Sequence, residues 1–325
     1  MLCNKTLVEC LETYSRKTLE YMAKDKGIQI ERNVSHTEMC RQIASYMLQP
    51  EIAELYFLCL FDDEILCLEQ GIQEDWKTEA YEGSYVIPML LCQSEYAFRF
   101  IEMSEDEELF WLPYDVAEVF MNMKSERFTE KRKTQNHGLS CLMAVDNFYG
   151  SVPLNILALL MKKNENEVKT FIEKLPPELN HYSIDEDTVY HQDLYLDEYG
   201  ILQNQKDVSY YIPDEEELSE LARFGYLPTR AEMRALVNYL MLETQQDVES
   251  AEYISMWIQK KTAAGESLHD IYNYLEEFGV LRIGERIPEL TDLLAAFQRN
   301  TRKMANRGFS DMELLRMKDI GVKEL

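Results

Sequence analysis

Four basic residues near the end of the chain are spaced so that they could bind an anion together. They lie in the stretch FQRNTRKMANRGF (297–309) and are Arg299, Arg302, Lys303 and Arg307. Separations of three and four residues place side chains on one face of a helix. Guanidinium and ammonium groups are natural partners of carboxylates and phosphates. We expect a helix that runs to Gly308, whose cations stabilise its carbonyl end and dock the last helix; the alternative is an anion or RNA contact through Arg302 and Arg307.

Two further groups of cations could contact phosphate. The first lies in KSERFTEKRKTQNHG (124–138) and consists of Lys131, Arg132 and Lys133. We expect that run to be a solvated linker, with a phosphate-contacting loop as the alternative. The second group lies near the N-terminus, where a basic face could be formed by Arg16, Lys17, Lys24, Lys26 and Arg41.

Residues that could support catalysis or hold a metal ion are sparse and scattered. The seven Cys include no CxxC pair, and none follows Cys141, which is typical of reduced thiols in a cytoplasm rather than of a zinc site. The chain contains no phosphate-binding glycine loop, no GxSxG and no HExxH. The acidic stretch HYSIDEDTVYH (181–191) is expected to be a solvated turn rather than a metal site. We therefore expect no catalytic residues, no metal and no cofactor.

The charge of the chain limits the partners that it can bind. Its formal net charge is −26; residues 1–50 hold seven Lys/Arg and six Asp/Glu, and the remainder holds 26 and 53. So negative a surface repels phosphate backbones, which excludes broad nucleic-acid binding but not binding by one small module. No run of apolar residues has the length of a signal peptide or a membrane span. We expect a soluble cytoplasmic protein.

The N-terminal segment reads as two short helices around an extended link. Gly27 should end the first helix, and SHTE (35–38) has the pattern of a capping box that begins the second, which should end before Pro50. This arrangement over residues 1–48 resembles the helix-extended-helix modules of the SAP and Rho-N-terminal type, which implies contact with nucleic acid. The Gly-x-Lys usual in those modules is replaced here by Val34, Ser35 and His36. A solvated helix pair that serves as an adaptor is the alternative.

The middle of the chain twice places a hairpin after helices. In SEYAFRFIEMSEDEELFWLP (94–113), alternating aromatic residues indicate a strand. An acidic turn follows it and leads into a second strand, which makes a hairpin. HYSIDEDTVYH has the same form on a smaller scale. This order predicts two winged-helix-like units, over residues 49–130 and 131–212.

Residues 213–325 carry the pattern of an all-helical domain. Thr229–Glu232 and Ser267–Asp270 have the spacing of capping boxes, and Gly225, Gly265 and Gly279 are expected to end helices. The predicted fold class is therefore mainly α with small β-hairpins (α+β).

The C-terminal part also carries a family resemblance. Residues 140–315 resemble a region of largely uncharacterised Firmicutes proteins. Three stretches carry the resemblance: YYIPDEEELSELARFGYLPTRAEMRALVNYL, RNTRKMANRGFSDMEL and YGSVPLNILALL. Many of those proteins carry a SEC-C zinc motif directly after this region. The residues that follow here, LLRMKDIGVKEL, contain no Cys, so we expect no zinc. The resemblance implies no activity.

Two hypotheses of function follow. The first is a non-enzymatic cytoplasmic adaptor or regulator that contacts nucleic acid, or a nucleic-acid-bound protein, through the N-terminal module. The alternative is an acidic protein-binding module, which could inhibit a basic nucleic-acid-binding protein by imitating nucleic-acid charge. No membrane partner is expected under either hypothesis.

Overall fold

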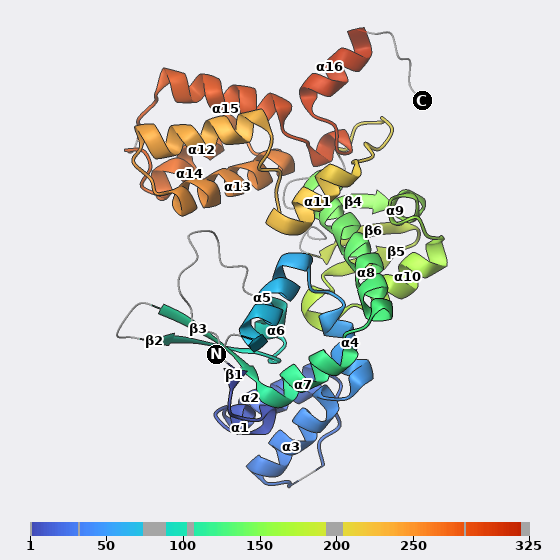
Figure 1. Cartoon of the computed structure of the whole chain (residues 1–325). Helices are drawn as coiled ribbons and strands as arrows, with labels where there is room; N and C mark the ends of the chain where they lie inside the picture. The colour runs from blue at the N-terminus through green and yellow to red at the C-terminus, as the bar shows by residue number, and fades with distance from the viewer. Residues whose placement is uncertain are drawn as a thin grey trace. The chain divides into compact units, whose positions relative to one another are not determined.

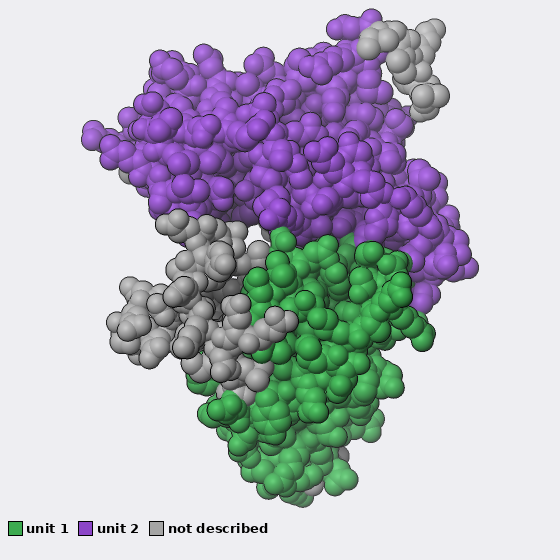
Figure 2. All heavy atoms as spheres, in the orientation of Figure 1, with its two compact units in different colours: residues 1–136, 171–181 green, residues 137–170, 182–325 purple. Residues whose placement is uncertain are grey.

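The described part of the chain is mainly helical and forms two compact units. The computed structural model describes residues 2–31, 33–73, 89–102, 107–192, 204–282 and 284–319 (Figure 1). One unit contains residues 1–136 and 171–181, and the other contains residues 137–170 and 182–325 (Figure 2). Helices dominate both units, and each has one small sheet, which confirms the predicted fold class. The predicted division into four domains is finer than these two units and stays a prediction.

Unit 1 contains the predicted helix pair near its N-terminus. Ser15 and Ser35 cap the helices α2 (Arg16–Asp25) and α3 (His36–Met47) by accepting the backbone N–H three residues ahead. Gly27 has φ +67°, the left-handed conformation that ends α2. The remaining helices of this unit are α1 (Leu7–Leu11), α4 (Pro50–Phe57), α5 (Asp62–Gln73), α6 (Met89–Gln93), α7 (Tyr114–Met123) and the first part of α8 (Glu126–Ala144).

The first predicted hairpin is confirmed, but its sheet has an additional strand. Strands β2 (Phe98–Glu102) and β3 (Glu107–Pro113) pair in antiparallel fashion; residues 103–106, the acidic turn between them, lie outside the described residues. Strand β1 (Leu2–Cys3) pairs with β3 in parallel. The third strand therefore comes from outside the predicted 49–130 unit. A buried hydrogen bond, from the Tyr96 hydroxyl to the Met47 carbonyl oxygen at 2.6 Å, also joins the two predicted segments.

Unit 2 has its own antiparallel sheet, which confirms the second hairpin. Strands β5 (Tyr182–Asp185) and β6 (Thr188–His191) form the hairpin, and β4 (Ser151–Pro153) pairs with β6. Between β4 and β5 the chain forms α9 (Leu154–Met161) and α10 (Glu165–Glu173). The last residues of α10, from Phe171 on, belong to unit 1. A π-helical turn, η1 (Val145–Tyr149), precedes β4 and ends at Gly150.

The C-terminal part of unit 2 is all-helical, as predicted. Its helices are α11 (Glu215–Phe224), α12 (Ala231–Glu243), α13 (Val248–Ala264), α14 (Leu268–Glu277), α15 (Pro288–Asn300) and α16 (Asp311–Asp319). Helices α12 to α15 pack around one apolar core (Figure 1). The Ser267–Asp270 capping box is present. The Thr229–Glu232 box is not, because α12 begins one residue later and the Thr229 hydroxyl donates to Glu220 instead.

Candidate functional site

The basic stretch 299–307 does not continue as a helix to Gly308, so the predicted shared face is wrong. Helix α15 ends at Asn300, where the Thr301 hydroxyl donates to the Phe297 carbonyl oxygen at 2.8 Å and the Asn300 amide to that of Ala296 at 2.9 Å. Side-chain donors that bond to the last carbonyls compete with helix continuation. The chain then runs through an extended segment and a short 3₁₀ turn, η4 (Met304–Asn306). Its cations consequently point in different directions.

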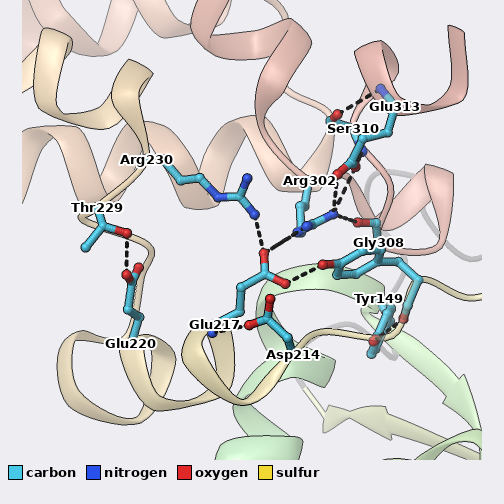
Figure 3. A network of polar contacts seen from close by, with 11 residues as sticks. Tyr149, Asp214, Glu217, Glu220, Thr229, Arg230, Arg302, Gly308, Ser310 and Glu313 are labelled. Atoms are coloured by element: carbon cyan, nitrogen blue, oxygen red, sulfur yellow. Dashed lines mark hydrogen bonds and ion pairs between the residues drawn. The ribbon is translucent and has the colours of Figure 1, made fainter. Parts of the chain in front are cut away.

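Arg302 lies in the protein interior and uses its guanidinium within the fold. Its side chain is 6% exposed. Its Nε and Nη2 donate to Glu217 Oε1 at 3.0 and 2.8 Å (Figure 3). Its Nη1 donates to the Gly308 carbonyl oxygen at 3.1 Å and to Glu313 Oε2 at 2.9 Å. The guanidinium also lies 3.4 Å from the ring centroid of Tyr211, a stacked contact that favours arginine over lysine.

Glu217, on α11, is the carboxylate at the centre of this network. It accepts hydrogen bonds from Arg230 and from the Tyr211 hydroxyl in addition to Arg302 (Figure 3). Burial and the hydrogen bond to Glu217 raise the pKa of Tyr211, so its hydroxyl remains a donor. A buried carboxylate is stable only when its oxygens are paired in this way.

Lys303 and Arg307 also bind to oxygens of this chain and hold the segment after α15 in place. The Lys303 ammonium lies 2.5 Å from Asp311, the first residue of α16. Although burial opposes ionisation, hydrogen bonds from Lys303 and Asn306 lower the pKa of Asp311. Arg307 donates to the Val208 carbonyl oxygen at 2.6 Å. The expectation that this stretch docks the last helix is therefore confirmed.

The anion-binding interpretation of the stretch has few side chains left to support it. The two cations proposed for it, Arg302 and Arg307, already contact oxygens of this chain. Arg299 is exposed and makes no ion pair with any residue that the structure describes. Contact of Arg302 or Arg307 with an external anion stays a prediction.

The run 131–133 lies within helix α8, so the expectation of a linker or loop is wrong. Arg132 is buried, and its guanidinium donates to the Leu60 carbonyl oxygen at 3.0 Å and to Asp62. Lys131 pairs with Glu54 at 2.6 Å, and Lys133 pairs with Glu130 at 2.9 Å. The face that this part of α8 buries within unit 1 is polar at Arg132, which is why the apolar pattern of a buried helix is missing.

The five N-terminal cations differ in their surroundings. Arg16 pairs with Glu20 at 3.0 Å and Arg41 with Glu38 at 3.4 Å, both on the surface. Lys26 points inward: its side chain is 4% exposed and its ammonium lies 2.9 Å from Glu178. Lys17 and Lys24 are exposed on α2. Of the predicted basic face, Lys26 is the side chain that the fold buries; Lys17 and Lys24 are exposed without a carboxylate partner among the described residues, and Arg16 and Arg41 are exposed within surface ion pairs.

A cavity of about 580 Å³ in unit 1 includes two of these lysines. Its charged lining consists of Lys24, Asp25, Lys26, Glu95 and Glu178. Burial raises the pKa of Glu95, whose carboxylate accepts the Tyr14 hydroxyl. No pattern in the sequence indicates the cavity, because its lining comes from three segments that only the fold brings together. Among the described residues, no group of three or more His, Cys, Asp or Glu could hold a metal ion.

An acidic surface in unit 2 was not predicted as a site. The turn between β5 and β6 exposes Asp185, Glu186 and Asp187, and the beginning of α10 exposes Glu165 and Glu167. Lys169, on α10, lies 4.0 Å from Asp187 in the turn. The two elements thus present negative charge from segments that are close in the fold.

Comparison with known proteins gives no match for this chain, either to a family model, to a curated protein or to a solved structure. Within the described residues, no helix has both the length and the apolar character needed to cross a membrane. The resemblances to SAP-type modules and to the region before SEC-C motifs stay predictions.

Proposed function

We propose that this chain is a non-enzymatic adaptor that binds a basic partner protein through an acidic surface of unit 2. The observation that carries the proposal is the exposed negative charge of α10 and the β5–β6 turn. Exposed carboxylates attract basic proteins and speed their association. They oppose association with phosphate.

The proposal includes the winged-helix-like interpretation of residues 131–212. The supporting observation is the element order, which is a helix, β4, α9, α10 and the β5–β6 hairpin, with β6 between β4 and β5. In helix-turn-helix proteins, the second helix of the pair enters the major groove. The helix in the corresponding position here is α10, which exposes Glu165 and Glu167. We therefore propose that this unit binds protein rather than DNA.

The nucleic-acid hypothesis is the competing proposal, and its support is narrower. It rests on Lys17 and Lys24, which α2 exposes, because Arg16, Lys26 and Arg41 are engaged with acids of this chain. Two cations give a weak phosphate contact, whose affinity falls only roughly tenfold between about 50 mM and about 200 mM salt.

The test compares three labelled probes: an octalysine peptide, a short DNA duplex and a short RNA. Binding is measured by fluorescence anisotropy at about 50 mM and about 200 mM salt. We expect salt-sensitive binding of octalysine and no binding of either nucleic acid. The variant Glu165→Gln/Glu167→Gln/Asp185→Asn/Asp187→Asn should bind octalysine several-fold more weakly.

A matched variant controls for net charge alone. Glu12→Gln/Glu31→Gln/Glu51→Gln/Glu118→Gln changes the charge equally at exposed positions of unit 1, and it should weaken binding less. Equal weakening by both variants would contradict a localised acidic surface. DNA or RNA binding that Lys17→Gln/Lys24→Gln abolishes would replace the proposal with the nucleic-acid hypothesis.

A further inference from the structure

Four aromatic residues form a continuous ridge on the surface of helices α13 and α14. We call Tyr253, Trp257, Tyr274 and Phe278 the aromatic ridge. Trp257 packs edge-on against Tyr274 and Phe278, with ring centroids 4.1 and 5.3 Å apart, and Tyr253 packs on Phe278 at 6.3 Å. Tyr253 is 55% exposed and Phe278 is 40% exposed.

Two of the ridge residues, Tyr253 and Phe278, lie outside the core that holds these helices together, whereas Trp257 and Tyr274 pack partly against it. Helix α13 buries Ile254 and Ile258, and α14 buries Ile271 and Leu275, in the apolar core of the helical domain. Tyr253 and Phe278 add little to that core because much of each ring faces solvent. Clustered, exposed aromatic side chains are characteristic of protein interfaces, where they supply much of the binding energy.

The surroundings of the ridge define the charge of what would cover it. Three exposed acids lie within four residues of Tyr253 or Phe278 along the chain: Glu249, Glu252 and Glu277. The chain's own Lys261 places its ammonium 5.2 Å from the Trp257 ring centroid and 5.3 Å from that of Tyr274. The ring faces of the ridge thus already accept a cation. Acids near aromatic rings complement a basic segment and repel phosphate.

We propose that the aromatic ridge is the docking surface for an arginine-rich segment of a basic partner protein. Guanidinium groups stack on the Tyr253 and Phe278 rings and pair with the nearby carboxylates. Arginine fits better than lysine because its planar group stacks and forms two parallel hydrogen bonds with one carboxylate. Elsewhere in this fold Arg302 stacks on the Tyr211 ring, and its Nε and Nη2 both donate to Glu217 Oε1. The inference rests on the proposed binding of a basic protein, but it assigns a separate surface and a side-chain preference.

The experiment titrates the full chain with octaarginine and octalysine, which carry the same charge. Binding is followed by peptide anisotropy and by Trp257 fluorescence in a background with the other two tryptophans, Trp76 and Trp111, replaced by Phe. We expect octaarginine to bind about five- to tenfold more tightly than octalysine, the effect of one or two stacked guanidiniums. Trp257 emission should change with octaarginine.

Two variants locate the preference. Tyr253→Ser/Phe278→Ser should bind both peptides equally, whereas Leu242→Ser/Leu315→Ser should keep the arginine preference. The control pair is also exposed, at 76% and 53%, on other helices of the same unit. Circular dichroism checks that both variants are folded.

The outcomes separate this inference from the proposed function. Equal binding of both peptides to the unmodified chain, or an arginine preference that survives in Tyr253→Ser/Phe278→Ser, would overturn the ridge as an arginine site and leave binding of a basic protein intact. Binding of neither peptide would overturn both. Self-association in sedimentation velocity that the ridge variant abolishes would assign the ridge to a second copy of this chain.

Discussion

Arg302 and Arg299 are three residues apart and carry the same charge, but the fold uses them differently. Arg302 is buried among Glu217, Glu313 and the Tyr211 ring, whereas Arg299 is exposed. A buried ion pair contributes little compared with apolar packing, but the loss of one partner leaves an uncompensated charge in the interior. The importance of each arginine therefore depends on its surroundings and not on its motif.

At the residue scale, we predict that Arg302→Ala lowers the free energy of unfolding by roughly 3 kcal/mol, because Glu217 then stays buried without its main partner. Arg299→Ala should change it by less than about 0.5 kcal/mol. Urea denaturation followed by circular dichroism measures both variants. Similar losses in the two variants would show that the Arg302 network adds no stability.

The ends of helices decide how unit 2 is assembled. Because α15 ends at Asn300, the following residues are free to form the 3₁₀ turn and the return at Gly308 that leads into α16. Gly308 has φ +89°, and a Cβ atom there would lie 2.7 Å from Cε1 of Tyr149. The connection between the last two helices thus needs glycine both for its backbone conformation and for space.

At the element scale, we predict that Gly308→Ala lowers the free energy of unfolding by about 2–4 kcal/mol. The loss comes from the left-handed backbone conformation together with overpacking on Tyr149. Gly265→Ala is the matched control, since Gly265 ends α13 with φ +101° and no atom lies within 4 Å of the added Cβ. It should cost about 1 kcal/mol, the backbone contribution alone. Thermal and urea unfolding compare the two, and equal costs would refute close packing at Gly308.

The whole molecule carries a large excess of negative charge. Ion pairing within the fold decides which of its charged side chains remain exposed. Buried or half-buried pairs such as Lys26–Glu178 and Arg302–Glu217 remove bases from the surface. Among the described residues, the exposed acids of α10, the β5–β6 turn and the aromatic ridge outnumber the cations beside them, which include Lys169 and Lys261. Self-repulsion of this kind opposes the compact state and favours a basic partner.

At the scale of the molecule, we predict that the melting temperature rises by several degrees between about 20 mM and about 200 mM NaCl, because salt screens the repulsion among exposed carboxylates. Differential scanning calorimetry measures the shift, and KCl at equal ionic strength controls for specific effects of sodium. A melting temperature that falls with salt would mean that attractive ion pairs outweigh the net charge of −26.

Local features of the fold were predictable from the sequence because they depend on neighbouring residues. Ser35 and Ser267 cap helices as expected, since a capping side chain bonds to a backbone N–H only three residues ahead. The β5–β6 hairpin follows from short strands around an acidic turn. Thr229 shows the limit of such patterns, because its hydroxyl found Glu220 on another helix instead of its own backbone.

The surroundings of charged side chains were decided only by the tertiary structure. Arg132 and Arg302 look like surface residues in the sequence, but Leu60, Asp62 and Glu217 bury and pair them from distant segments. The cavity lined by Lys26 and the group of acids near the aromatic ridge arise in the same way. The sequence by itself determined the capped helices, the hairpins and the total charge, all of which are local or additive, but neither the helix through residues 131–133 nor the end of α15 at Asn300. Which charges remain available to a partner depends on long-range pairing. A buried arginine stabilises the folded state only where the fold places a carboxylate beside it, and it destabilises the folded state where no carboxylate is present.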